Sequence, residues 1–347
     1  MGIHLVTGGS GYVGDNITNK LVELGEKVYS LDVISNVNKR KGVEYIQGSV
    51  LDESLIDDLT SQCNYVHHNA ALVPLTKSGS EFNKVNVEGT KIVVNYALKN
   101  KVSHFCHMSS SAVFGIPAEL PLKYSSLRKP IEIYGQSKKD AEDIVMTFMA
   151  SNPNFSCSIV RPRTILGTNR LGIFELLFRW ISKGKSIFVI GKANSPFQFA
   201  HIDDIANASI NSCLLRKKGI YNVGTLNFNS LTDDLTELIN FSNNSSKIIH
   251  LPESVTINGL ALLDKLNLSP FAPWHYLTYH KPFFFDSQYV YDELDYEPKG
   301  SNIDILKESY KSYIENYKDN TDLTLSPHKS KLKSTFIDLI ANIISLK

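Results

Sequence analysis

The chain has 347 residues, and its 36 basic and 35 acidic residues almost cancel. With this balance no overall electrostatic field attracts nucleic acid or an anionic membrane, so we expect no nucleic-acid partner. No run of ~18 apolar residues predicts a membrane span. A single hydrophobic core stops growing near ~250–300 residues, so we expect a main domain and a smaller lobe.

The cysteines indicate a reducing compartment. Cys63, Cys106, Cys157 and Cys213 are widely spaced in apolar or strand-like segments and form no Cys-x-x-Cys pair. This usage suits reduced thiols in a cytoplasmic protein. The first residues already have the pattern of a buried strand, so we expect no signal peptide.

A glycine-rich turn at 8–14 follows the first predicted strand, 3–7. Gly8 allows a tight turn, Gly11 lets the backbone approach a pyrophosphate, and Gly14 lets the next helix pack against the strand. The pattern predicts a dinucleotide site.

The helix after the turn begins at Tyr12 and Val13, and its free N–H groups face the expected anion. A second predicted strand closes with Asp32, whose carboxylate can hold both hydroxyls of an adenosine ribose. We therefore expect NAD. The basic run at 39–41 would suit the 2′-phosphate of NADP, but we favour its interpretation as solvated loop charge.

Two further predicted strands, 43–47 and 65–69, lead into four candidate cofactor contacts: Ser49, Val50, Ala70 and Ala71. The small residues Ala70 and Ala71 leave space for the cofactor. The adjacent His67 and His68 suggest metal ligands at first sight. Adjacent strand residues point to opposite faces, however, and no acidic or thiol ligand converges nearby, so we expect no metal.

The fifth predicted strand, 104–108, ends in three serines, among them Ser110 and Ser111, at the sheet edge where doubly wound folds bind ligands. A serine turn without chemistry is the alternative. Tyr134 and Lys138 share a helix face, which sets a phenol beside an ammonium group. A phenol titrates near ~10, so a neighbouring cation favours its use as a base.

Together these motifs resemble the extended short-chain dehydrogenase/reductase family. The family holds nucleotide-sugar epimerases and dehydratases, 3β-hydroxysteroid dehydrogenases and dihydroflavonol reductases. The similarity covers about residues 3 to 300 and includes Asn86-Val-x-Gly-Thr and Arg161-Pro162. It implies an α/β fold, a Rossmann-type doubly wound parallel sheet with a smaller C-terminal substrate lobe, and a homodimer.

The resemblance also implies roles for individual residues. Ser110 would hydrogen-bond the substrate oxygen and Tyr134 would be the acid/base. Lys138 would bind the nicotinamide ribose and lower the tyrosine pKa. Asn86, Arg161 and Pro162 would complete the cofactor site.

Three departures from the family pattern affect the expected function. Ser49 replaces an acid that usually lies near the adenine. Phe197 and Gln198 replace an Arg-Asp pair whose arginine many nucleotide-sugar enzymes use on the substrate diphosphate, which weakens the case for such a substrate. Ser111-Ala112 replaces the Asp-Glu of the dehydratases, which argues against water loss.

We expect a dinucleotide domain at 1–160, a substrate lobe at 161–318 with some strands returning to the main sheet, and a linker and tail helix at 319–347. An apolar helix at 172–181 would wall a substrate pocket or pack between lobes. The aromatic segment 271–286 would be core, with a lid or a subunit contact as alternatives. The candidate substrate contacts are Ser111, Arg163, Arg170, Arg179 and Phe197.

The tail from Lys331 to Lys347 has one apolar side, so we expect it to dock within the protein or its dimer, or to make a peripheral membrane contact.

The leading functional hypothesis is an NAD(P)-dependent epimerase or oxidoreductase that acts on a secondary hydroxyl or keto group of a sugar or sugar nucleotide. A dehydrogenase for a less polar substrate, similar to the steroid or flavonol enzymes, is the alternative. A redox-sensing NAD-binding protein without catalysis is a third hypothesis, although such a protein has no need of Ser110, Tyr134 and Lys138 together.

Overall fold

The computed structural model describes residues 2–35, 39–73, 79–169, 172–266 and 273–317. Its main sheet has seven parallel strands in the order β10-β6-β5-β4-β1-β2-β3. The strand order reverses beside β1, which pairs with β2 on one side and β4 on the other. This is the doubly wound Rossmann-type topology, so the predicted fold class is confirmed. The strands are β1 (Ile3–Thr7), β2 (Lys27–Asp32), β3 (Val43–Gln47), β4 (Tyr65–His68), β5 (His104–Met108), β6 (Cys157–Pro162) and β10 (Gly219–Val223).

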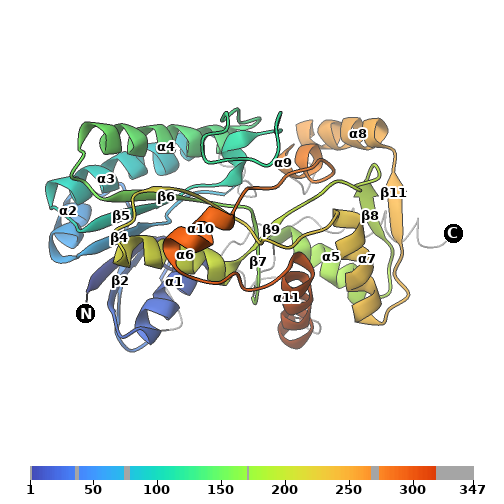
Figure 1. Cartoon of the computed structure of the whole chain (residues 1–347), viewed down its shortest axis with the longest axis horizontal. Coiled ribbons are helices and arrows are strands. Elements are labelled where there is room, and N and C mark those ends of the chain that lie inside the picture. The colour runs from blue at the N-terminus through green and yellow to red at the C-terminus, as the bar shows by residue number, and fades with distance from the viewer. Residues whose placement is uncertain (1, 36–38, 74–78, 170–171, 267–272, 318–347) are drawn as a thin grey trace.

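Helices cover both faces of this sheet (Figure 1). On one face lie α2 (Glu53–Gln62), α3 (Gly89–Lys99) and α4 (Ile133–Ser151), and on the other lie α1 (Tyr12–Glu23) and α6 (Ile202–Leu214). In each layer the helices pack an apolar stripe on buried residues of the strands. The helix residues of these stripes include Ile56, Val94 and Val145 on the first face and Ile17, Leu21 and Ile205 on the second. The carboxyl ends of all seven strands therefore meet at one edge.

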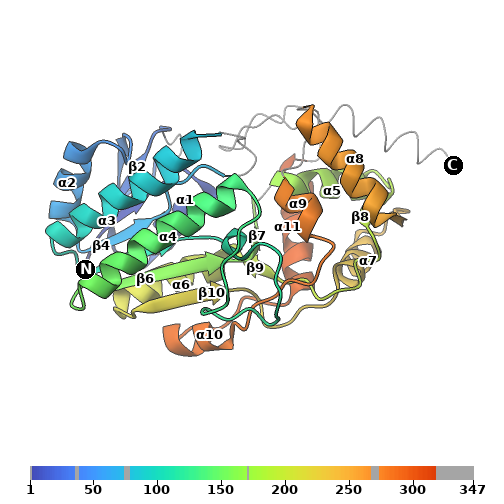
Figure 2. The ribbon, with the colours of Figure 1, turned by 90° about the horizontal axis from the view of Figure 1, so that it is seen from above.

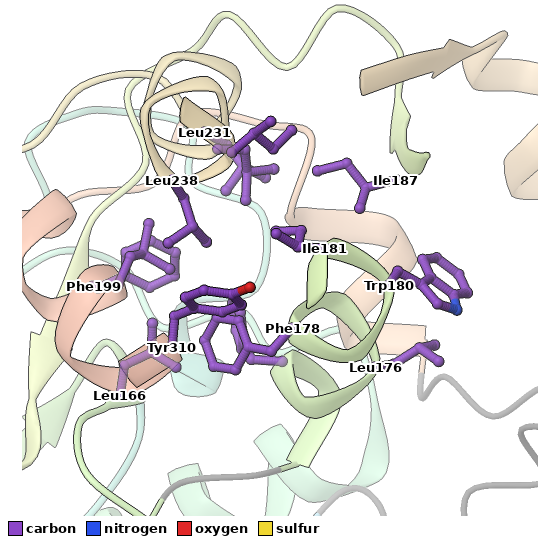
Figure 3. Close-up of a cluster of buried hydrophobic side chains, with 14 of the residues drawn as sticks. Leu166, Leu176, Phe178, Trp180, Ile181, Ile187, Phe199, Leu231, Leu238 and Tyr310 are labelled. Carbon is purple, nitrogen blue, oxygen red and sulfur yellow. The ribbon is translucent and has the colours of Figure 1, made fainter. Parts of the chain in front are cut away.

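A smaller lobe lies beyond that edge (Figures 1 and 2). Its two-stranded parallel sheet joins β8 to β11. Its elements are α5 (Gly172–Ser182), β8 (Ile187–Ile190), α7 (Leu231–Ser242), β11 (Ile248–Leu251), α8 (Glu253–Lys265), α9 (Pro273–Thr278) and α11 (Asn302–Tyr317). Figure 3 shows part of its core, which includes Leu166, Phe178, Ile181, Ile187, Phe199, Leu231, Leu238 and Tyr310.

A pair of short strands lies between the lobes. The strands β7 (Thr164–Leu166) and β9 (Phe199–His201) pair with each other, and β9 contacts both α6 and α11. α10 (Gln288–Leu294) packs near β10 and α6 of the main domain. Since β10 follows elements of the smaller lobe and yet pairs with β6, the chain passes between the lobes more than once. A boundary at residue 160 stays a prediction.

Some predicted boundaries were wrong. β6 extends past 160 because Arg161 and Pro162 pair with β10. A helix predicted from the sequence to begin at residue 207 begins instead at Ile202, where the His201 ring caps it by accepting the backbone N–H of Asp203 (3.0 Å). Asn86 lies inside a π-helical segment, η2 (Asn83–Glu88), that precedes α3. The sequence did not predict α2, β8, β11 or α8.

The aromatic segment is core, as predicted, for the residues that are buried in it: Trp274, Tyr276, Phe283 and Phe285. All four cysteines are buried free thiols. Within the described part of the chain, no helix is both long and apolar enough to cross a lipid bilayer. The predicted tail helix and Arg170 lie outside the described residues.

Candidate active site

The glycine turn allows segments of backbone to approach each other more closely than a side chain would permit. Gly8 has φ +66°, and a Cβ there would lie 2.8 Å from the Ala70 nitrogen. A Cβ on Gly14 would lie 2.1 Å from the Gly8 carbonyl oxygen. Gly11 precedes α1 in an extended conformation and supplies no side-chain cap. The turn therefore presents bare backbone at a helix N-terminus, which fits a dinucleotide pyrophosphate.

Asp32 closes β2 beside this turn, and the backbone holds its carboxylate. One oxygen accepts the N–H of Ser10 (3.0 Å) and the other accepts the N–H of Ile34 (3.0 Å). A carboxylate oxygen accepts more than one hydrogen bond, so the ribose hydroxyls remain possible donors. The structure thus brings Asp32 and the glycine turn together as the ribose prediction requires.

The neighbouring cofactor candidates differ in how their side chains are used. The Tyr12 hydroxyl donates to the Thr168 carbonyl (3.0 Å), which ties the turn to the segment after β7. Val13 packs partly buried in the α1/α6 layer. The Ser49 hydroxyl accepts the Leu51 N–H (3.1 Å), and Val50 is buried in the core. Contacts of these residues with adenine stay predictions.

The loop after β4 is fixed by Asn86. Its side-chain oxygen accepts the Leu72 N–H (2.8 Å), and its nitrogen donates to the Leu72 carbonyl (3.2 Å) and to the Ser137 hydroxyl (3.0 Å). Ala70 is held at the same loop by its N–H, which donates to Thr7 (3.2 Å). Asn86 thus couples the loop that includes Ala71 to helix α4.

Lys138 is buried at 3% exposure, and its ammonium donates to the carbonyl of Met108 (2.6 Å), the last residue of β5. Burial lowers the pKa of Lys138 to about 8, and the carboxylate of Glu142 opposes that shift. The contact holds the lysine at the carboxyl end of the sheet, because Met108 directly precedes the three serines.

Tyr134 lies one helical turn before Lys138, at the start of α4. Glu132 caps this helix by accepting the N–H groups of Tyr134 (2.9 Å) and Gly135 (2.7 Å). The Tyr134 ring contacts Phe82 edge to face at 6.0 Å between centroids. Ser110 begins the 3₁₀ turn η3 (Ser111–Phe114), where its hydroxyl accepts the Ala112 N–H (3.2 Å). Both residues therefore lie at the sheet edge where Lys138 is held.

Glu142, which the sequence analysis missed, organises a buried ion-pair network behind this site. Its carboxylate accepts Nε and Nη2 of Arg161 (2.8 and 2.7 Å), Nη1 of Arg128 (3.0 Å) and the hydroxyl of Ser109. Arg161 also donates to the Tyr124 carbonyl (2.8 Å). These contacts give Arg161 a structural role, and contact of Arg161 or Pro162 with the cofactor stays a prediction. Glu142 lies four residues after Lys138 and so shares its face of α4, which is the sequence feature that could have identified it.

Arg163 and Phe197, both predicted substrate contacts, meet each other. The guanidinium carbon of Arg163 lies 4.6 Å from the centroid of Phe197 and 4.1 Å from that of Phe283. Nη1 donates to the Ser111 hydroxyl (3.3 Å). Burial lowers the pKa of Arg163 to about 9, and Tyr279 opposes the shift. Three predicted substrate residues are thus adjacent, whereas Arg179 lies on α5 in the smaller lobe.

His67 and His68 point to opposite faces of the sheet. The His67 ring is within 2.8 Å of the Ser209 hydroxyl on α6, and the His68 ring is within 3.0 Å of the Thr90 hydroxyl on α3. Among the described residues, no three His, Cys, Asp or Glu side chains gather as a metal site would require.

A parallel doubly wound sheet with a glycine turn, an acid at the end of β2 and a Tyr/Lys pair at its carboxyl edge is typical of dinucleotide-dependent enzymes. Residues 4–224 match the model of the NAD dependent epimerase/dehydratase family. The chain belongs to this family of NAD-dependent enzymes, and the predicted resemblance is confirmed at that level.

The chain is 33% identical to an uncharacterized protein, y4nG, of Sinorhizobium fredii, over 99% of this chain and 86% of that protein. It is 30% identical to a 4-hydroxy-2-methyl-3-oxo-4-farnesyl-3,4-dihydroquinoline-1-oxide ketoreductase of Stigmatella aurantiaca, over 52% of this chain and 58% of that enzyme. A UDP-glucuronic acid 4-epimerase of Bacillus cereus, solved with NAD, has the same fold with a TM-score of 0.74 and 20% identity, covering 91% of this chain and 100% of that one.

Proposed function

We propose that this chain transfers a hydride between NAD and a secondary alcohol or ketone of a sugar-type substrate. Tyr134 is the acid/base, Lys138 supports it, and Ser110 orients the substrate oxygen. The observation that carries this proposal is the 2.6 Å contact of Lys138 with Met108, which holds the lysine beside the serines that end β5.

The proton path uses residues of the chain itself. In oxidation, Tyr134 accepts the proton of the substrate hydroxyl, and in reduction it returns that proton to the oxygen. Lys138 stabilises the phenolate through its charge. Since the Ser110 hydroxyl accepts an N–H from Ala112, its own proton is available to the substrate oxygen. NAD, when bound, supplies the acceptor or donor of the hydride.

We expect NAD to bind more tightly than NADP. The Asp32 carboxylate would repel a 2′-phosphate. Arg40, in the basic run that would attract this phosphate, instead forms a two-point ion pair with Asp15 (2.5 and 3.0 Å). Titration of both cofactors at moderate salt tests this. The Asp32→Asn variant should narrow the difference, and tighter binding of NADP by the wild type would contradict the prediction.

An epimerase-type cycle predicts retained cofactor. An epimerase returns the hydride that it removed, so release of NADH in mid-cycle would strand a keto intermediate. Asp32 and the glycine turn favour firm binding of the cofactor, whereas Ser49 removes one expected adenine contact. The protein should be purified without added nucleotide and denatured, and the supernatant assayed for NAD. Near-stoichiometric NAD is the expected result. An empty site, together with steady NADH production from a hydroxyl substrate, would identify a dehydrogenase instead.

A reductase or dehydrogenase acting on a less polar substrate is the second candidate. Phe197 occupies the position where the family resemblance would place a diphosphate-binding arginine, and it is buried against Arg163 and Phe199. Gln198 is buried too, and it bridges the Thr225 carbonyl (2.7 Å) and the Phe285 N–H (2.8 Å). The similarity to a ketoreductase supports this candidate. Turnover of an apolar ketone with free NADH, without action on a UDP-sugar, would favour it.

A further inference from the structure

Arg163 is a buried cation with two nitrogens, Nε and Nη2, that have no partner in the described part of the chain. They form one edge of the guanidinium, which we call open because it has no acceptor there, although it is buried. Its side chain is 2% exposed, and no hydrogen-bond acceptor among the described residues reaches its Nε or Nη2. No carboxylate of the described residues pairs with it either. An unpaired buried charge is destabilising in general, so this guanidinium is suited to a counter-charge supplied by a bound ligand.

The unused hydrogen-bonding capacity of the guanidinium lies along one edge. The guanidinium carbon lies over the rings of Phe197 and Phe283, and Nη1 donates to the Ser111 hydroxyl. The remaining edge is formed by Nε and Nη2, whose N–H bonds point in the same direction. This is the geometry that receives two oxygens of one planar anion.

Arg161, two residues earlier, shows what this edge binds in the same protein. Its Nε and Nη2 donate side by side to the two oxygens of Glu142. Arg161 is therefore a paired counterpart of Arg163: both are buried beside aromatic rings, but among the described residues only Arg161 has a carboxylate partner.

The open edge lies near the expected chemistry. Ser111 directly follows Ser110, and Arg163 directly follows β6, so both residues lie at the carboxyl edge of the sheet. Phe283 also belongs to the apolar cluster against which Tyr134 packs.

We propose that Nε and Nη2 of Arg163 bind a carboxylate of the substrate, so that this enzyme acts on an acidic hydroxy or keto compound. This inference rests on the proposed hydride transfer and names its substrate class. The ring faces of Phe197 and Phe283 exclude water from the pair and strengthen the charge-assisted hydrogen bonds.

The test compares two probes of similar shape and different charge, benzoate and benzamide, by titration calorimetry on NAD-loaded protein. The wild type should bind benzoate saturably and bind benzamide at least about tenfold more weakly. Arg163→Met should lose benzoate binding. Arg163→Lys keeps the charge without the paired edge and should bind at least about tenfold more weakly than wild type. Arg216→Met, a change at an exposed arginine of the main domain, should bind as wild type does.

Thermal melting without probe shows which variants fold. If Arg163→Met does not fold, the benzoate affinity of Arg163→Lys tests the proposal. Absence of benzoate binding by the wild type, equal binding of benzamide, or unchanged binding by a folded Arg163 variant would each overturn the proposal. Tyr134→Phe separates it from the proposed function, because that change should lower turnover by about 10²–10⁴ and leave benzoate binding intact.

Discussion

Replacement of Tyr134 by phenylalanine is expected to lower turnover by about 10²–10⁴ while NAD affinity stays nearly unchanged, because the change removes only the proton-transferring oxygen. The phenylalanine ring keeps the edge-to-face contact with Phe82 and the packing against the neighbouring apolar cluster. The measurement is steady-state turnover together with equilibrium binding of NAD.

Two matched variants make the result specific. Tyr96→Phe removes a phenol on α3 that bonds Glu53 at the surface, and it should be neutral. Lys138→Met should impair both turnover and NAD binding, because it removes the ammonium held at the end of β5. Activity of Tyr134→Phe within about tenfold of wild type would show that another group moves the proton.

The features that the sequence predicted correctly are local. The glycine turn and the 134/138 spacing each lie within one strand-turn-helix unit or one helix face, so a short stretch of sequence specifies them. The strands β1 and β2 also contain short buried runs rich in apolar residues, which are visible in the sequence.

The features that the sequence did not predict depend on distant segments. The Glu142 network draws its donors from β6, from the end of β5 and from the Arg128 segment before α4. The pairing of β8 with β11 likewise joins segments that α6, β10 and α7 separate in the chain. No periodicity specifies such contacts, because their partners are fixed only when the tertiary fold forms.

The environment of Arg163 also could not be predicted from the sequence. The sequence singled it out as one of several arginines that could meet an acidic substrate, and nothing in its spacing distinguished it from Arg179. Its enclosure by Phe197 and Phe283 and its open edge come from three separate segments.

Replacement of Glu142 by glutamine is expected to lower the free energy of unfolding by about 3–5 kcal/mol, measured by urea denaturation. The carboxylate is fully buried and is shared by Arg161, Arg128 and Ser109. A glutamine has a similar shape but no charge, so the buried guanidinium of Arg161 would lose its counter-charge.

Asp143 provides a matched control one residue along the same helix. It pairs with the same Arg128 (2.6 Å), but its side chain is 42% exposed, so Asp143→Asn should cost no more than about 1 kcal/mol. Equal losses for the two variants would show that burial of the pair is not what makes Glu142 important.

Glu142→Gln should also change the pH dependence of turnover. Burial lowers the pKa of Lys138 to about 8, and Glu142 opposes this shift, so its neutralisation should lower the lysine pKa further. A lysine is charged below its pKa, and the charged form supports Tyr134. The alkaline limb of the pH profile should therefore move to lower pH in Glu142→Gln and stay in place in Asp143→Asn. An unmoved limb in a folded Glu142→Gln enzyme would show that the ionisation of Lys138 does not set the alkaline limit.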